Sequence, residues 1–246
     1  MKINVKKLFR IIIPIVWLIL FGRLLSRDYF IEKLDIREKQ AIQRGLEESY
    51  MGIYFKNERI GYVKNHVVKN ANDSFNLEQE AVMNLNILDN TYPVKMSLSA
   101  ELNNESLLKN FRFNLISTFY ELHATGEVVG NEVHYSMNTG KDESSNIIQL
   151  NDAPFISTHM RSYLLHNDIK EGEKYKIPYF DPVTMSGQES IIEYKGFKKE
   201  FIREKGRIYN LHHFVESIAG MRIDFFLDQD GNVIKETSPV GFVFYS

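Results

Sequence analysis

The feature that most constrains this fold is a long alternation between apolar and polar residues over positions 75–87. Its apolar members are Phe75, Leu77, Ala81, Met83, Leu85 and Ile87. Only Gln79 interrupts the apolar series, and only Val82 interrupts the polar one. A period of two that lasts for thirteen residues is typical of a long β-strand with one buried face and one exposed face.

Similar alternation recurs along the rest of the chain. Short polar turns separate the alternating segments, so six or seven successive strands are expected to form an antiparallel meander. A helix is expected near 154–164, where apolar residues recur at helical spacing at Ile156, Met160, Tyr163 and Leu164. The predicted fold is mainly β, a large antiparallel meander sheet or half-barrel with one or two helices, preceded by a single N-terminal membrane helix.

The net charge of −2 hides two regions of opposite charge. Residues 1–27 hold six Lys and Arg and no acid, whereas 28–246 hold 24 bases against all 32 acids, a net charge of −8. The acidic body argues against nucleic acid as a partner, because neutralising phosphates requires a basic face.

An apolar segment lies within the basic start. Residues 11–22 are uncharged, and apolar neighbours extend the segment to 8–25, about 27 Å at the rise of an α-helix. We expect a signal anchor that crosses a membrane once through 8–25, with the N-terminus in the cytoplasm. A cleaved signal peptide and a buried soluble helix are the alternatives.

The chain is therefore expected to have three parts. Residues 1–27 form the basic start and anchor, and residues 50–246 form one β domain on the far side of the membrane. Residues 28–49 carry an imperfect apolar stripe among charged residues, which indicates a helical stalk or, as a sharper alternative, a coiled-coil contact.

No segment carries a recognisable catalytic constellation. The absence of cysteine excludes a thiol nucleophile, a disulfide and a thiolate zinc site. The segment 228–232, DQDGN, lacks the EF-hand spacing and is better interpreted as a hairpin turn. The adjacent His212 and His213 are expected to point to opposite faces of a strand. We predict no catalytic residue, no cofactor and no metal site.

The apolar strand faces are more informative than the polar residues. They are rich in methionine and aromatic side chains, which are adaptable enough to line a site for an acyl chain or an apolar segment of a partner. An ordinary core is the alternative interpretation. The candidate lining residues are Met83, Met96, Leu98, Phe111, Phe113, Tyr120, Tyr135, Met137 and Met160.

Several short segments resemble a known family. They are 50–55, YMGIYF; 59–62, RIGY; 180–182, FDP; and 230–236, DGNVIKE, with Gly241 beyond. Over about 48–246 the chain resembles the non-catalytic N-terminal β region of bacterial membrane-anchored transglutaminase-like proteins. That family uses a Cys-His-Asp set, so the resemblance to a chain without cysteine implies an accessory domain. The meander is also similar in outline to bacterial periplasmic lipoprotein-carrier half-barrels.

These observations predict a non-enzymatic β domain in the periplasm, anchored in the bacterial inner membrane. It is expected to bind a protein partner or an apolar or lipid ligand in envelope biogenesis or secretion. One alternative is a hydrolase of envelope polymers that uses carboxylates brought together by folding. The other is a structural subunit of an inner-membrane complex that makes contacts through an open sheet edge.

Overall fold

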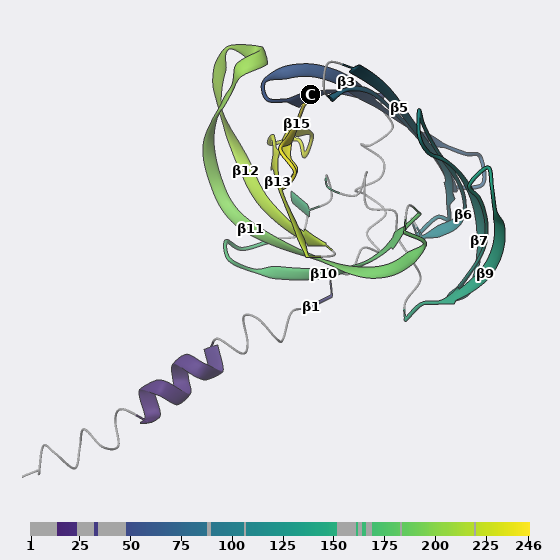
Figure 1. The fold of residues 1–246 in the computed structure, drawn as a ribbon. Helices are drawn as coiled ribbons and strands as arrows, with labels where there is room; N and C mark the ends of the chain where they lie inside the picture. The colour runs from purple at the N-terminus through teal and green to yellow at the C-terminus, as the bar shows by residue number, and fades with distance from the viewer. Residues whose placement is uncertain are drawn as a thin grey trace, which may run out of the picture.

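The fold is dominated by one fifteen-stranded sheet that curls into a barrel-like shape (Figure 1). This computed structural model describes residues 14–23, 32–33, 48–87, 90–105, 107–151, 161, 164–165, 169–182, 184–218 and 220–246. The strands are β1 (Glu32–Lys33), β2 (Ser49–Phe55), β3 (Glu58–Lys69), β4 (Phe75–Ile87), β5 (Asn90–Leu102), β6 (Leu108–Ser117), β7 (Glu121–Val129), β8 (Glu132–Asn138), β9 (Glu143–Gln149), β10 (Lys174–Asp181), β11 (Ser186–Ile202), β12 (Arg207–Ile218), β13 (Met221–Leu227), β14 (Val233–Thr237) and β15 (Phe242–Tyr245). A short 3-10 helix, η4 (Arg203–Lys205), connects β11 to β12.

The strand order joins the two ends of the domain in the middle of the sheet. It runs β1-β10-β11-β12-β13-β14-β15-β2-β3-β4-β5-β6-β7-β8-β9, and the last strand, β15, pairs with β2. Every pair is antiparallel except β1 with β10. The predicted mainly β fold with a large antiparallel sheet is confirmed, and β2 to β9 form an uninterrupted meander.

The two ends of the sheet approach each other across the interior. Leu150, just after β9, lies so close to Gly187 on β11 that a Cβ there would be 2.1 Å from Leu150 Cδ2. The rings of Phe180 on β10 and Phe111 on β6 have centroids 5.1 Å apart. Residues of this same chain therefore cover the inner face of β3 to β8, which removes much of their apolar surface from water.

The polar interruption at Gln79 has a structural reason. Gln79 Nε2 donates a hydrogen bond to Asn65 Oδ1 at 2.8 Å, and Asn65 Nδ2 donates to Ser49 Oγ at 3.2 Å. Asn65 is buried. The three side chains connect β4, β3 and β2 on the inner face, so the buried amides are satisfied rather than orphaned.

The N-terminal expectations are only partly covered by the described residues. Residues 14–23 are helical and their apolar side chains are exposed, whereas 8–13 and 24–25 of the predicted anchor lie outside the described residues. No helix within the described parts of the chain is both long and apolar enough to cross a membrane.

The stalk prediction is wrong at the residues where it can be compared with the structure. Glu32 and Lys33 form β1, which pairs in parallel with Tyr175 and Lys176 of β10, and Ser49 already belongs to β2. Backbone pairing with an otherwise open edge outweighs a weak helical stripe. Residues 28–31 and 34–47 of the expected stalk lie outside the described residues. Ile156, Met160 and Tyr163 of the expected helix also lie outside them.

Gly61 allows β3 to approach β4 closely, and its substitution provides a test of this packing. A Cβ at Gly61 would lie 2.0 Å from the carbonyl oxygen of Val82 and 2.7 Å from Met83 Cα, which are backbone atoms. We expect Gly61→Ala to lower the free energy of unfolding by about 1–3 kcal/mol, because the backbone itself must shift. Urea unfolding measures this loss. Gly22→Ala is the control, since nothing lies within 4 Å of a Cβ at Gly22; equal stability of the two variants would contradict the packing.

Candidate functional site

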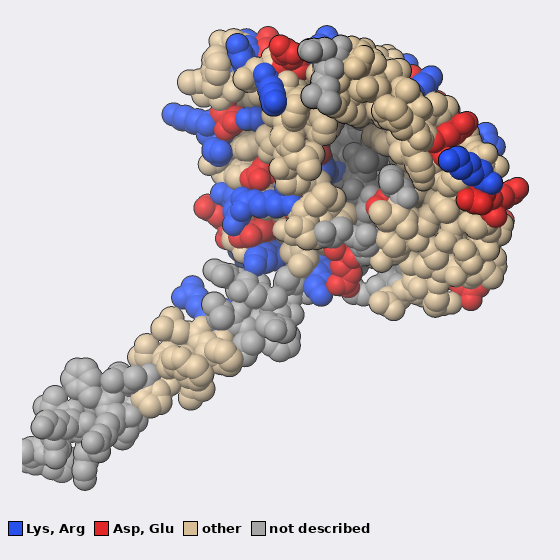
Figure 2. Space-filling view, in the orientation of Figure 1, with Lys and Arg blue, Asp and Glu red and all other residues tan. Residues whose placement is uncertain are grey.

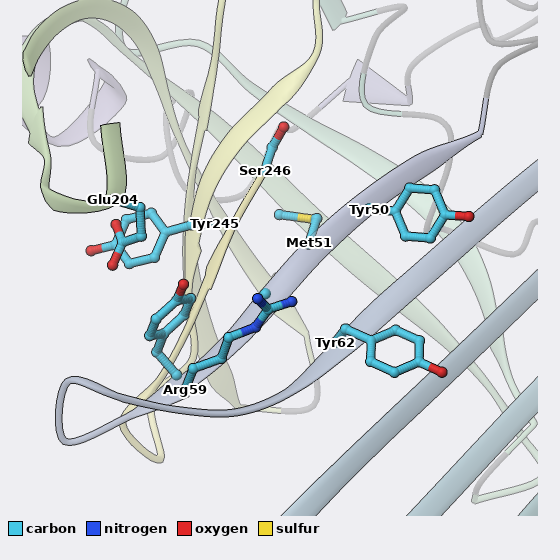
Figure 3. Close-up of a pocket in the computed structure, with 9 residues that line it drawn as sticks. Tyr50, Met51, Arg59, Tyr62, Glu204, Tyr245 and Ser246 are labelled. Atoms are coloured by element: carbon cyan, nitrogen blue, oxygen red, sulfur yellow. The ribbon is translucent and has the colours of Figure 1, made fainter. Parts of the chain in front are cut away.

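A cleft of about 460 Å³ opens where β15, β2 and β3 meet the η4 turn (Figure 3). Its walls are mainly aromatic, and its lining residues are Tyr50, Met51, Gly52, Tyr54, Arg59, Tyr62, Glu204, Tyr245 and Ser246. The volume and the apolar character, with a few polar groups, are those of a binding site for a small molecule or for a few side chains of a partner.

The pleat of β2 directs its tyrosines to the outer face. Ile53 is buried against the inner core, so Tyr54 and Tyr50 point the other way, on either side of Gly52. Tyr245 on β15 pairs with Gly52, and its ring meets the ring of Tyr54 edge-on, with 5.4 Å between centroids. Gly52 leaves space for this arrangement, because a Cβ there would be 2.8 Å from Tyr54 Cε2.

Arg59 supplies a positive charge in the middle of the cleft. Its Nε donates a hydrogen bond to the Gly61 carbonyl at 3.4 Å, and no carboxylate of the described residues pairs with its guanidinium. Figure 3 shows this side chain between the tyrosines of the two walls. An exposed guanidinium beside aromatic faces can bind a carboxylate in a bidentate manner.

The other titratable groups at or beside the cleft are Lys64, Tyr245 and the carboxylate of Glu204. Lys64 Nζ pairs with Glu48 at 2.8 Å and lies over the Tyr50 ring, and the hydrogen bond to Glu48 raises the pKa of Lys64. Burial raises the pKa of the Tyr245 phenol, and the carboxylates of Glu204 and Glu200 raise it further. The phenol therefore stays protonated and can donate a hydrogen bond at neutral pH.

A second polar constellation is a buried ion cluster around Arg161. Arg161 Nη2 donates to Glu216 Oε2 at 2.9 Å, Nη1 donates to Glu236, and the guanidinium lies 4.4 Å from the centre of the Phe225 ring. Ser190 Oγ donates to the other oxygen of Glu216 at 2.6 Å. Burial alone lowers the pKa of Arg161, but the carboxylates of Glu236 and Glu216 outweigh it and raise the pKa. This cluster attaches the segment at Arg161 to β12 and β14.

A metal site or a general acid places specific requirements on the polar groups of the described residues. Within the described residues, no group of three His, Asp or Glu side chains could hold a metal ion. The described carboxyl groups with a resolved pKa shift, namely Glu48, Glu101, Glu173, Glu200 and Asp224, all have a lowered pKa. A general acid needs the opposite shift, so none of these five carboxyl groups supports the hydrolase alternative, which stays a prediction.

The candidate residues on the strand faces mostly lie in the interior. Leu98, Phe111 and Phe113 are buried, and Met96, Tyr135 and Met137 pack against the same core. Met83 and Met96 contact a neighbouring core cluster formed by Ile53, Val63 and Ala81. Met160 lies outside the described residues. Seven of these nine side chains therefore form part of the hydrophobic core. Their predicted role in binding an apolar ligand stays a prediction.

Tyr120 corrects the predicted pattern. Its side chain is 47% exposed, and its backbone N–H donates to Ser117 Oγ at 3.0 Å in the turn before β7. The expected inward orientation is wrong because β7 begins at Glu121, so the alternation of the strand does not yet apply to Tyr120.

The tyrosine cleft was not among the sites predicted from the sequence. Segments 50–55 and 59–62 were singled out for their resemblance to a family, but period-two alternation assigns Tyr50, Tyr54 and Tyr62 to a solvent-facing side. The available signal was the unusual number of tyrosines on that side, because exposed strand faces are normally polar. Tyr245 and Glu204 join the site only through folding.

The fold and the cleft together define a β-barrel-like domain with an aromatic site on its outer face. A solved β-barrel-like protein of the domain-of-unknown-function family DUF1849 from Brucella abortus has a similar structure, with a TM-score of 0.56 and 13% identity. The match covers 81% of this chain and 94% of that one. It supports a β-barrel-like fold, whereas the resemblance to the transglutaminase-associated region stays a prediction.

A second solved structure matches less well. It is a DUF1089 family protein from Pseudomonas aeruginosa, with a TM-score of 0.36, 12% identity, and coverage of 70% of this chain and 87% of that one. No protein-family model and no curated protein matches this sequence.

Proposed function

We propose that this protein is a non-enzymatic, β-barrel-like binding domain whose tyrosine cleft takes a short segment of a protein partner. The segment carries a carboxylate that pairs with Arg59 and apolar side chains that pack against the tyrosines. The observation that carries the proposal is the combination of four tyrosines with an arginine that has no carboxylate partner among the described residues.

The chemistry of these side chains supports a protein partner. Tyrosine, arginine and tryptophan are the residues most enriched at the hot spots of protein interfaces, the few positions that contribute most of the binding energy. Tyrosine offers a large rigid surface with a polar tip and loses little conformational entropy on binding. Cross-strand contacts already hold Tyr54 and Tyr245 in place, so the site is organised before the partner arrives.

The setting of the domain is part of the same proposal. The exposed apolar run at Ile15–Phe21 supports attachment to a membrane at the N-terminal end, with the β domain on the periplasmic side. A membrane-attached binding domain would serve envelope biogenesis or secretion by holding a partner near the bacterial inner membrane.

Peptide display tests the cleft directly. Peptides selected from a random library on the purified chain are expected to carry an acidic residue beside apolar residues. Tyr54→Ala and Arg59→Glu should each weaken the binding of a selected peptide by about 30-fold, the effect of losing a dominant interface residue. Fluorescence anisotropy with the labelled peptide measures the Kd.

The matched control is Tyr120→Ala, which removes an exposed tyrosine in a turn far along the sheet from the cleft. This variant should bind the selected peptides as well as the unaltered chain does. Selected peptides that lack acids, or that bind equally to Tyr54→Ala and Tyr120→Ala, would place the binding site elsewhere and overturn the proposal.

A further inference from the structure

The hairpin of β11 and β12 has a free face at its tip. Pairing continues to Ile202 and Arg207, and η4 with Gly206 at φ 62° closes the turn. Ile202 and Leu211 are buried on one face, where they pack with Phe226 and Ile234. Residues 203–208 are all exposed, so the tip is fixed from one side and open on the other.

Large apolar side chains lie on that open face. Phe197 and Phe201 are each 57% exposed and Ile208 is 66% exposed, and Phe201 pairs with Ile208 across the hairpin. The Phe197 ring lies against the His212 ring, with 4.0 Å between centroids, which holds it in position. Side chains of this size gathered at the end of a hairpin mark an interaction surface.

The same tip is basic, although the body of the protein is acidic. Positions 195–207 contain six Lys and Arg against two Glu, whereas residues 28–246 as a whole carry a net charge of −8. Glu200 is engaged by Lys235 at 2.5 Å and by Lys198 at 3.4 Å. Figure 2 shows Lys and Arg side chains, with some Asp and Glu among them, beside uncharged surface at this end of the molecule. The bases without an ion-pair partner among the described residues are Lys199, Arg203, Lys205 and Arg207.

We propose that this tip, residues 195–208, docks onto the surface of a bilayer that contains anionic phospholipid. Lipid phosphates would attract the unpaired bases, while Phe197, Phe201 and Ile208 would enter the boundary between headgroups and acyl chains. An aliphatic side chain such as Ile208 has no role in stacking on nucleic-acid bases, which favours the membrane over nucleic acid. Glu204 of the same tip lines the tyrosine cleft, so docking would hold the cleft close to the membrane.

The absence of cysteine makes a site-specific test simple. The full chain with Phe201→Cys, labelled with an environment-sensitive fluorophore, is mixed with vesicles of phosphatidylcholine and phosphatidylglycerol in equal amounts. The emission is expected to shift to the blue with these vesicles and to stay unchanged with phosphatidylcholine alone. The same label at Ile147→Cys on β9, also an exposed position, should not respond.

Charge reversal separates docking by the tip from attachment by the N-terminal segment, which is the same in every variant. Lys199→Glu combined with Arg203→Glu should weaken the response at position 201 by about 25-fold or more, since each membrane-facing base contributes about fivefold. Added salt should weaken it as well. Lys141→Glu, in the exposed turn before β9, should leave it unchanged.

Three results would overturn the proposal. One is an unchanged emission at position 201 with the anionic vesicles. Another is an equal response of the labels at 201 and 147, which would indicate contact without any preference for the tip. The third is a response at 201 to a single-stranded oligonucleotide but not to vesicles, which would make nucleic acid the occupant.

Discussion

Arg161→Ala is expected to lower the free energy of unfolding by about 3–5 kcal/mol, the cost of removing one partner from a buried ion pair. Glu216 is only 2% exposed, and Arg161 pairs with both Glu216 and Glu236. Without the guanidinium, two carboxylates would remain near each other in the interior, and Phe225 would lose its cation–π contact. Urea unfolding monitored by circular dichroism gives the loss in stability.

The control for this prediction is an exposed arginine on a strand. Arg112→Ala on β6 should change stability by no more than about 0.5 kcal/mol, as is usual for surface substitutions. Replacing Arg161, Glu216 and Glu236 together by apolar residues of similar volume should cost much less than Arg161→Ala alone, because no buried charge is left unpaired. An effect of Arg161→Ala as small as that of Arg112→Ala would mean that the cluster is solvated.

The second large effect is expected in the hydrophobic core on the inner face of the curved sheet. Phe113→Ala should lower the free energy of unfolding by about 3–5 kcal/mol, because it removes a buried aromatic ring and leaves a cavity. Phe113 is 1% exposed and packs in the core that the two ends of the sheet share. Thermal and urea unfolding of the purified chain measure this loss.

Phe119→Ala provides the comparison, since Phe119 is 76% exposed in the turn between β6 and β7. It contacts only the ring of Tyr92 among the described aromatic groups, so about 1 kcal/mol is the expected cost. If Phe113→Ala were as mild as Phe119→Ala, the inner face would be open space available to an exchangeable apolar ligand. The expected difference instead identifies Phe113 as core.

The local pattern of the sequence predicts the strands well because a half-buried strand leaves a simple signature. The alternation over 75–87 coincides with β4, and the succession of such segments coincides with the meander. Even the exception at Gln79 is consistent with a buried face, since its amide hydrogen-bonds to Asn65. Period-two alternation records which side of a strand is buried, and this information is local.

The parts that could not be predicted depend on contacts between distant segments. Arg161 lies 55 residues from Glu216 and 75 from Glu236 along the chain. The cleft requires β15 to pair with β2, which places Tyr245 opposite Gly52. Likewise, β1 forms by pairing in parallel with β10 at Tyr175 and Lys176. None of these pairings leaves a periodic trace in the sequence, so only the fold reveals them.

The tip of β11 and β12 could be predicted from the sequence only in part. Its bases and aromatic residues are adjacent in the sequence and can be read directly over 195–208. What the sequence does not indicate is that Phe197, Phe201 and Ile208 remain exposed while Ile202 is buried. A bulge near Gly196 shifts the register of β11, and this changes which residues face outward.

The most direct test of the central claim is photo-crosslinking in living cells. A photoreactive phenylalanine analogue placed at Tyr62, at the rim of the cleft, should yield a discrete protein adduct that mass spectrometry can identify. The same analogue at Tyr120 should not yield it, and the adduct from position 62 should disappear when Arg59→Glu is introduced. A cleft that binds a partner predicts this pattern; equal crosslinking from Tyr62 and Tyr120, or an adduct insensitive to Arg59→Glu, would contradict it.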